Sequence, residues 1–475
     1  MSDASDKHGN EWFDVAVIGA GSAGFSAAIT AADAGARVAL IGHGEIGGTC
    51  VNIGCVPSKA LIRAVEILHS ARLSARFDGI EASACVTNWA DVMGQKQSLV
   101  DHLRQAKYRD VLSAYDGVSY LEGKASFGKT GKLLLDGKTV NANKIIITTG
   151  ARPALPAVEG IQSVPFLTST TALTLQELPA SLLVIGAGYI GAELAQIFAR
   201  AGVKVTMVSR RGLLPEAEPE IGAALTAYFE QEGITLVKAT RYESIQQTNP
   251  GVALSVSGAN GPQTLHAEKV LLATGRTPNT DSLNLTDANI ATLENEAIVI
   301  DAQMRTSRAG VYAAGDVTGA DQFVYMAAYG AKLAAMNAMN GDTLSYDNAA
   351  MPAVVFTDPQ VASVGLTEAA ARTSGRAIKV SILTLDNLPR ALAARDTRGL
   401  IKLVADADSH QLLGAHILAP EGADSIQTAA MAIKAAMTYD ELGAMIFPYL
   451  TTVEGIKLAA QTFDRDVKSL SCCAG

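Results

Sequence analysis

Two copies of the pattern G-x-G-x-x-G, each directly after an apolar run, constrain the fold of this chain more than any other feature. In such a turn one glycine makes the bend, one lets a pyrophosphate approach the backbone, and one lets the helix pack on the strand. Each copy therefore predicts strand, tight turn, helix and strand, with phosphates at the helix N-terminus. We expect an α/β protein with two Rossmann-like dinucleotide-binding domains. The glycines are Gly19, Gly21 and Gly24 in the first copy, and Gly186, Gly188 and Gly191 in the second.

The residue that ends the second strand of each copy indicates which dinucleotide is preferred. A carboxylate there accepts hydrogen bonds from a ribose 2′-hydroxyl, whereas an arginine binds a 2′-phosphate. The second copy has Ser209, Arg210 and Arg211 at this place, which favours NADPH over NADH. The alternative is that an arginine only solvates the strand end. The first copy has Gly42 instead of an acid, so its ribose would be held by Glu45 or by backbone groups.

Three further segments support a flavin in the first copy. Gly150 and Gly275 each follow an apolar strand in a Thr-Gly turn, as at domain crossovers. Residues 306–319 end a strand at Asp316, whose carboxylate would hold the ribityl hydroxyls of a flavin. Each segment alone is typical of an ordinary strand and turn. The flavin interpretation therefore depends on the order in which these segments occur before and after the second copy.

Two pairs of cysteines lie at opposite ends of the chain. Cys50 and Cys55 are spaced so that one helical turn brings both thiols to disulfide distance, downstream of the first glycine turn, where a redox pair would exchange electrons with a flavin. The alternative is a pair of buried structural thiols. Cys472 and Cys473 are adjacent, so their Cα atoms lie about 3.8 Å apart, less than the roughly 4.4–6.8 Å of relaxed disulfides. A disulfide between these two adjacent cysteines would be strained, whereas their two thiolates can bind one metal ion together. Cys85 has no cysteine near it and is expected to be a small buried residue.

Composition narrows the class of protein. The chain has 475 residues, 48% hydrophobic and 18% charged, with a formal net charge of -9, as a folded multidomain protein would. This charge argues against a general nucleic-acid binder. No apolar run reaches the length of a membrane span, and the acidic N-terminus lacks a secretory pattern. We expect a cytoplasmic protein that binds no nucleic acid, has no stable membrane association, and uses clustered cysteines for catalysis or metal binding.

The segment GGTCVNIGCVPSK, residues 47–59, resembles the redox-disulfide signature of the flavoprotein disulfide reductases. Both glycine turns, ATGRTPN and AAGD extend this resemblance along nearly the whole chain. It implies a homodimer that uses FAD and NADPH. The implied domains are an FAD-binding domain at 12–153 and 277–350, an NADPH-binding domain at 154–276, and an α+β dimerisation domain at 351–475 with the Cys-Cys tail.

The resemblance also assigns roles to single residues. Cys55 would be the thiolate against the flavin, and Cys50 would be the exchanging thiol. Lys59 and Glu193 would form an ion pair beside flavin N5, and Tyr189 would gate the nicotinamide pocket. The implied FAD contacts are Gly19, Gly21, Gly24, Thr49, Lys59, Gly150, Glu193 and Asp316, and the implied NADPH contacts are Gly186, Gly188, Gly191, Ser209, Arg210, Arg211 and Gly275.

Residues 447–463 distinguish between members of this family. Disulfide reductases carry a His-Glu pair in a HPTxxE-like segment, and the histidine protonates the leaving thiolate. The corresponding FPYLTTVEG has no histidine, and Tyr449 stands five residues before Glu454, where the histidine would stand. A phenol with a pKa of about 10 is a poor proton relay at neutral pH. A substrate that needs soft ligands and no proton fits better, and thiolates bind soft cations strongly.

SCCAG, FPYLT and MPAVVFTDPQVA resemble the mercuric reductases of that family, and the match runs from about residue 12 to 475. It implies NADPH-dependent reduction of Hg(II) to Hg(0), with Hg(II)-dithiol complexes as substrate and delivery from the tail of the other subunit. No GMTCxxC motif occurs, so we expect delivery by the tail, small thiols or a partner protein. A thioredoxin-type disulfide reductase remains an alternative, and so does a non-enzymatic metal-binding flavoprotein, which the NADPH pattern disfavours. The implied metal ligands and lining residues are Cys50, Cys55, Cys472, Cys473, Tyr189 and Tyr449.

Overall fold

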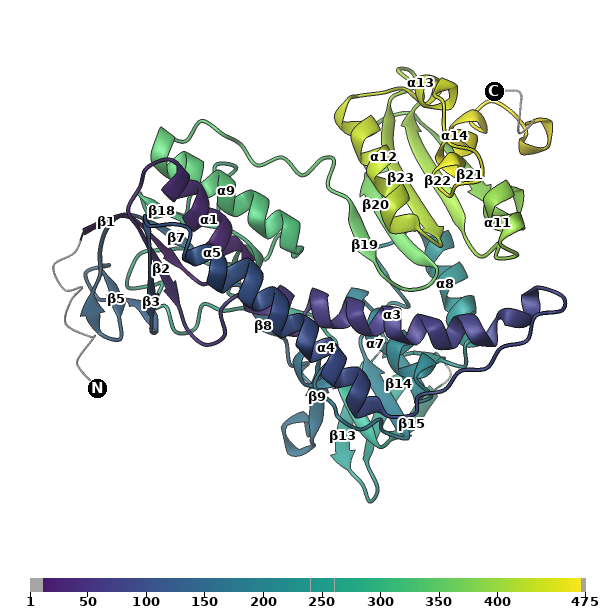
Figure 1. Ribbon diagram of the computed structural model, residues 1–475, viewed down its shortest axis with the longest axis horizontal. Coiled ribbons are helices and arrows are strands. Elements are labelled where there is room, and N and C mark those ends of the chain that lie inside the picture. The colour runs from purple at the N-terminus through teal and green to yellow at the C-terminus, as the bar shows by residue number, and fades with distance from the viewer. Residues whose placement is uncertain (1–11, 240, 260, 471–475) are drawn as a thin grey trace. The chain divides into compact units, whose positions relative to one another are not determined.

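The computed structural model describes residues 12–239, 241–259 and 261–470. Backbone contacts divide the chain into two compact units (Figure 1). The first unit contains the described residues of 1–58, 93–154 and 275–347, and the second unit contains those of 59–92, 155–274 and 348–475. Cys472 and Cys473 lie outside the described residues.

A five-stranded parallel sheet in the order β18-β7-β1-β2-β3 forms the centre of the first unit. Its central strand β1 (Trp12–Ile18) is buried from Val15 to Ile18. Parallel strands covered on both faces are apolar throughout rather than alternating, which is why this run carries no polar residue. The strands beside it are β2 (Val38–Gly42) and β7 (Asn141–Ile147), and the outer strands are β3 (Val118–Glu122) and β18 (Val311–Ala313).

Helices α1 (Ser22–Asp33) and α9 (Val324–Asn340) pack together over one face of this sheet (Figure 1). Alanines dominate both helices, and their backbones approach so closely that Ser26 Oγ donates a hydrogen bond to the Ala328 carbonyl at 2.7 Å. A small antiparallel sheet packs on the opposite face through Phe127 and Leu133. The other elements of this unit are α2 (Gly48–Ile53), α5 (Asp110–Leu112), β4 (Ala125–Phe127), β5 (Leu133–Leu135), β6 (Lys138–Thr139), β8 (Ala151–Pro153) and β17 (Arg276–Pro278). Two long helices, α3 (Cys55–Arg72) and α4 (Trp89–Arg104), contain residues of both units.

The second unit contains another five-stranded parallel sheet, in the order β12-β11-β10-β16-β9. Its central strand β10 (Ser181–Ile185) is buried from Leu182 to Ile185, and the amphipathic helix α7 (Tyr189–Arg200) follows it after the second glycine turn. The remaining elements here are α6 (Ser169–Ala172), α8 (Pro219–Gln231), β9 (Phe166–Thr168), β11 (Lys204–Ser209), β12 (Thr235–Lys238), β16 (Lys269–Leu272) and an antiparallel sheet of β13 (Arg241–Gln247), β14 (Val252–Gly258) and β15 (Gly261–Ala267).

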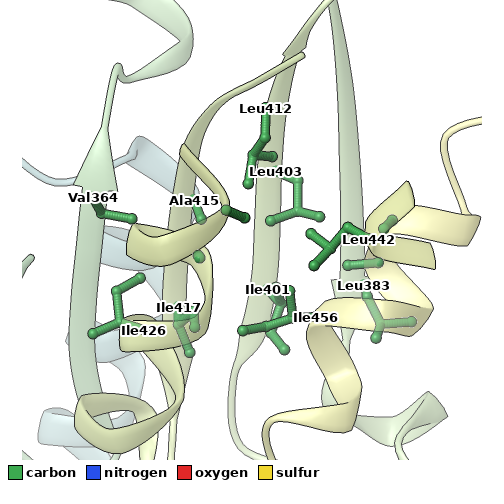
Figure 2. Packing of buried hydrophobic residues seen from close by; sticks show 14 of the residues in the cluster. Val364, Leu383, Ile401, Leu403, Leu412, Ala415, Ile417, Ile426, Leu442 and Ile456 are labelled. Atoms are coloured by element: carbon green, nitrogen blue, oxygen red, sulfur yellow. The ribbon is translucent and has the colours of Figure 1, made fainter. Parts of the chain in front are cut away.

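The C-terminal part of the second unit is an antiparallel sheet in the order β19-β20-β23-β22-β21, covered by helices. Figure 2 shows Ile426 beside Ile417, and Ile456 beside Ile401 in the same core. The strands are β19 (Ala353–Val355), β20 (Gln360–Gly365), β21 (Ile378–Thr384), β22 (Leu400–Asp406) and β23 (Leu412–Ala419); the helices are α10 (Glu368–Thr373), α11 (Pro389–Ala393), α12 (Gly422–Lys434), α13 (Tyr439–Ala444) and α14 (Glu454–Gln461).

These sheets confirm the predicted α/β class with two Rossmann-like folds and a C-terminal α+β part. One expectation was wrong: Cys85 is exposed, because it lies in a segment without helix or strand between α3 and α4. Among the described residues no helix is both long and apolar enough to cross a membrane.

Candidate redox and nucleotide sites

The first glycine turn connects β1 to α1 through close backbone contacts. Gly19 has φ +118, and a Cβ there would overlap the Thr148 carbonyl. A Cβ on Gly24 would overlap the carbonyl of Gly19. Gly21 caps α1 without a side-chain hydrogen bond, so the first N–H groups of this helix have no side-chain acceptor at the cap. The turn thus matches the predicted glycine roles, and its helix terminus suits an anionic phosphate.

The cysteine-bearing segment packs directly against this turn. Gly47 and Gly48 both have positive φ, and a Cβ on Gly48 would come within 2.7 Å of the Gly21 Cα atom. Helix α2 begins at Gly48 and carries Cys50, and α3 begins at Cys55; both cysteines are half-buried. The backbone contact between Gly48 and Gly21 therefore brings the start of the cysteine segment beside the N-terminus of α1.

Tyr108 belongs to the same site, although no sequence pattern pointed to it. Its hydroxyl lies 3.0 Å from Ser22 Oγ in the first turn of α1, and its ring meets Phe25 edge-on at 4.8 Å. Burial raises the pKa of Tyr108, and the negative charges of Cys50 and Cys55 raise this pKa further, against the lowering effect of the Ser22 hydrogen bond. Tyr108 therefore lies against the nucleotide turn, and the cysteine pair is close enough to affect its pKa. It lies in a π-helical turn at Gln105–Arg109, a feature found often at functional sites.

A half-buried acid-base pair fits the predicted flavin contact at Asp316. The Arg276 Nε atom lies 3.4 Å from Asp316 Oδ2, and the two side chains are 12% and 22% exposed. Burial raises the pKa of Asp316, and the Arg276 charge opposes that rise. Arg276 donates to the Ala151 carbonyl through Nη2, but its buried Nε has no hydrogen-bond partner among the residues that the structure describes. A buried carboxylate beside an unsatisfied donor suits a ligand rich in hydroxyl groups.

The first strand end shows why Gly42 replaces the expected acid. A Cβ on Gly42 would come within 2.8 Å of the Tyr120 ring and 2.9 Å of the Ala20 Cβ atom. No side chain fits there without displacing Tyr120. Glu45, the proposed substitute, is 64% exposed and its Oε2 lies 3.0 Å from Arg104 Nη1.

Of the three remaining predicted contacts, Gly150 and Gly275 lie beside the β8–β17 pair and Thr49 lies on α2. Thr49 is exposed on α2. Gly150 and Gly275 both have positive φ, and the Gly275 carbonyl accepts the N–H of Ala154 at 2.9 Å. Strand β8 pairs with β17 next to these glycines. The chain therefore leaves this unit after residue 154 and re-enters it at residue 275 beside one hydrogen-bonded ribbon.

The second glycine turn repeats the first in the second unit. A Cβ on Gly186 would overlap the Ala273 carbonyl, and one on Gly191 would overlap the carbonyl of Gly186, whereas Gly188 faces open space. Helix α7 begins at Tyr189 and has no side-chain cap hydrogen bond. Tyr189 is half-buried; burial raises its pKa, and the charge of Glu216 raises it further. The open second glycine and uncapped helix are what an approaching pyrophosphate needs.

The arginines predicted to select NADPH follow β11 in a turn without a carboxylate at the strand end. Ser209 Oγ donates to the Gly212 carbonyl at 2.8 Å and accepts the N–H of Arg211 at 3.4 Å. Both arginines are exposed. Arg211 Nη1 lies 2.7 Å from Glu216 Oε1, and both of these side chains are 70% exposed. An exposed ion pair contributes little net energy, so a phosphate could displace Glu216.

Lys59 and Glu193 form the predicted ion pair in the second unit. Lys59 Nζ lies 2.7 Å from Glu193 Oε2, and the side chains are 34% and 8% exposed. Glu193 Oε1 accepts the N–H of Phe356 at 2.9 Å. The Lys59 ammonium lies 4.7 Å from the centroid of the Phe356 ring. Phe356, which sequence reasoning missed, therefore contacts both members of the pair.

Tyr449 lies 54% exposed in the loop before α14. Leu450 has φ +61, and its N–H donates to Glu454 Oε2 at 3.2 Å. Glu454 is buried, which raises its pKa, against the lowering effect of the Leu450 hydrogen bond. The acid that would orient a histidine in a disulfide reductase therefore holds the loop backbone. Within the described residues, no three His, Cys, Asp or Glu side chains form a group that could hold a metal ion.

Comparison with known proteins identifies relatives of this chain over most of its length. The family model described as pyridine nucleotide-disulphide oxidoreductase matches residues 13–336, and the dimerisation domain of that family matches residues 351–460. The chain is 47% identical to the mercuric reductase of Shigella flexneri, covering 99% of this chain and 84% of that protein. It is 44% identical to the mercuric reductase of Streptomyces lividans, covering 98% of each. A solved structure, the Cu(II) complex of the HOCl-induced flavoprotein disulfide reductase RclA from Escherichia coli, matches with a TM-score of 0.84 at 30% identity, covering 95% of this chain and 99% of that one.

Proposed function

The chain belongs to the mercuric reductases of the pyridine nucleotide-disulphide oxidoreductase family, and we propose that it is a homodimeric enzyme that reduces Hg(II) to Hg(0) with NADPH and FAD. The observation that carries the proposal is the packing of Gly48 against Gly21, which sets the Cys50–Cys55 segment against the first nucleotide turn. The full-length similarity to mercuric reductases supports Hg(II) as the substrate.

The residues of the first unit fit FAD. The N-terminus of α1, beyond Gly21, would hold the pyrophosphate, and Asp316 would accept hydrogen bonds from ribityl hydroxyls. The orphaned Nε of Arg276 would donate to the same group. When bound, FAD supplies two-electron transfer between the nicotinamide and the cysteine pair. Lys59 follows Cys55 by one helical turn on α3, and Glu193 holds its ammonium in the second unit.

Hg(II) would reach the cysteine pair by thiolate exchange. Cys472 and Cys473 of the partner subunit would take Hg(II) from a dithiol complex, and Cys50 and Cys55 would then displace them. Each exchange forms one Hg–S bond and breaks another, so no bare ion is released. Two electrons from a first NADPH would convert the Cys50–Cys55 disulfide to thiolates, two from a second would reduce the bound Hg(II), and the neutral atom would leave both thiolates. Tyr189 and Tyr449 would line this site.

The loop around Tyr449 supports a metal substrate over a disulfide. Reducing a disulfide requires a proton for the leaving thiolate, which needs a group with a pKa near the working pH. A phenol has a pKa of about 10, and Glu454 is engaged by the Leu450 backbone. Transfer of Hg(II) between thiolates requires no such proton.

An anaerobic assay with NADPH, Hg(II) and excess thiol tests the proposal by measuring mercury vapour and NADPH oxidation together. The double variant Cys472→Ala/Cys473→Ala should lose turnover with strongly chelated Hg(II) but keep FAD reduction by NADPH. Cys85→Ala removes an exposed cysteine outside this machinery and should behave as wild type. Failure of the wild type to release mercury would refute the proposal, and higher activity on a disulfide protein would favour a thioredoxin-type reductase.

A further inference from the structure

Tyr242 of β13 lies against the end of β11, where the two arginines begin. Its hydroxyl donates to the Val208 carbonyl at 3.3 Å, and the backbone of Arg210 also hydrogen-bonds to it. The guanidinium carbon of Arg210 lies 5.8 Å from the centroid of the Tyr242 ring. One half-buried side chain thus contacts the backbone on both sides of Ser209 and supports the Arg210 head group.

We propose that Tyr242 is a specificity-determining positioning residue, which holds Arg210 ready for the 2′-phosphate of NADPH. This inference rests on the proposed use of NADPH. A guanidinium held over an aromatic face keeps its N–H edge directed outward, where it can bind a phosphate through two hydrogen bonds. Pre-ordering this long side chain also removes part of the entropy lost on binding.

The neighbouring residues of the turn are less suited to this task. The hydroxyl of Ser209 is engaged within the turn, with Gly212 as acceptor and Arg211 as donor. Arg211 is paired with Glu216 at an exposed position, so a phosphate would first have to displace a carboxylate. Arg210 is supported by a neutral ring instead of an acid. Burial raises the pKa of Tyr242, which keeps the phenol protonated and able to donate to Val208.

Binding of 2′,5′-ADP and 5′-AMP to the FAD-loaded enzyme, measured by calorimetry, separates the phosphate contact from the rest of the nucleotide site. Tyr242→Leu removes the ring and the hydroxyl, and should weaken 2′,5′-ADP binding about tenfold while 5′-AMP binding changes less than about twofold. Tyr242→Phe keeps the ring and should lose about threefold. In an Arg210→Ala background, Tyr242→Leu should have no further effect on the ratio of the two affinities.

Tyr228 provides a matched control, because Arg398 lies 6.0 Å from its ring centroid in the same unit. Tyr228→Leu should leave the affinity ratio unchanged. If Tyr242→Leu weakens both nucleotides equally, or weakens neither, the positioning role is wrong. If the wild type binds 2′,5′-ADP no more tightly than 5′-AMP, the NADPH preference itself is wrong, which is a separate failure from that of Tyr242.

Discussion

Replacing Glu193 by alanine should lower the free energy of local opening at the Phe356 amide. The size of this loss follows from two contacts of the Glu193 side chain. The Glu193 side chain is 8% exposed, and its two oxygens bind Lys59 Nζ at 2.7 Å and the Phe356 N–H at 2.9 Å. Leaving the N–H without a partner costs about 1–2 kcal/mol. Losing the ion pair costs about 1 kcal/mol, because Lys59 is one-third exposed and water screens its charge. The sum is about 2–3 kcal/mol.

Glu193→Gln separates these two contributions. The amide oxygen still accepts the Phe356 N–H, so this variant should lose only the ion pair, about 1 kcal/mol. A protein of this size does not unfold in one step, so a local measurement is needed. Hydrogen exchange at the Phe356 amide, followed in a peptide that contains this residue, reports the free energy of local opening. A loss of 2 kcal/mol corresponds to about thirtyfold faster exchange.

The outcome that would refute this reasoning is equal exchange in the two variants. Equal values would mean that the carboxylate acts only through its charge and that the Phe356 hydrogen bond contributes nothing. Lys59→Met supplies the complementary control. It removes the cation but keeps the hydrogen bond from the Phe356 N–H to Glu193, so exchange at Phe356 should change less than in Glu193→Ala.

Three further outcomes are expected. Lys402→Met should lower the local free energy of opening around β22 by about 3–5 kcal/mol, measured as faster hydrogen exchange of that strand, because it removes the cation 2.9 Å from the Glu218 carboxylate, which is 2% exposed; adding Glu218→Gln should recover part of that loss. Burial lowers the pKa of His416, so its contribution to stability is present above its unfolded pKa of about 6.5 and is lost as pH falls below that value. His416→Gln should therefore flatten the fall of Tm between pH 7.5 and 5, and an unchanged slope would contradict the assignment. Tyr449→His should raise NADPH-dependent reduction of a small disulfide about tenfold by restoring a general acid near Glu454; no gain would mean that the missing histidine does not set the substrate class.

The sequence predicted the two nucleotide folds because their signal is local. An apolar run such as Val15 to Ile18, followed by glycines with fixed backbone roles, determines strand, turn and helix together. Tyr108, Arg276 and Phe356 escaped prediction for the opposite reason. Each reaches its site from a segment distant in the chain, and no spacing rule connects a tyrosine in a helical turn to cysteines far upstream. The burial of Cys85 was predicted wrongly because residue type alone ignores how little packs around a segment without helix or strand.

The two strand ends show why the residue at one position does not decide nucleotide binding by itself. In the first fold, Tyr120 of β3 lies beside β2 and fills the space that a side chain at Gly42 would need. In the second fold, Tyr242 of β13 lies at the end of β11 and supports Arg210. In the first fold a tyrosine from another strand thus leaves no room for a side chain at the strand end. In the second fold such a tyrosine supports the arginine side chain there. In the proposed sites the motif would fix where the phosphates lie, and a tyrosine contributed from elsewhere in the chain would determine which side chain meets the ribose.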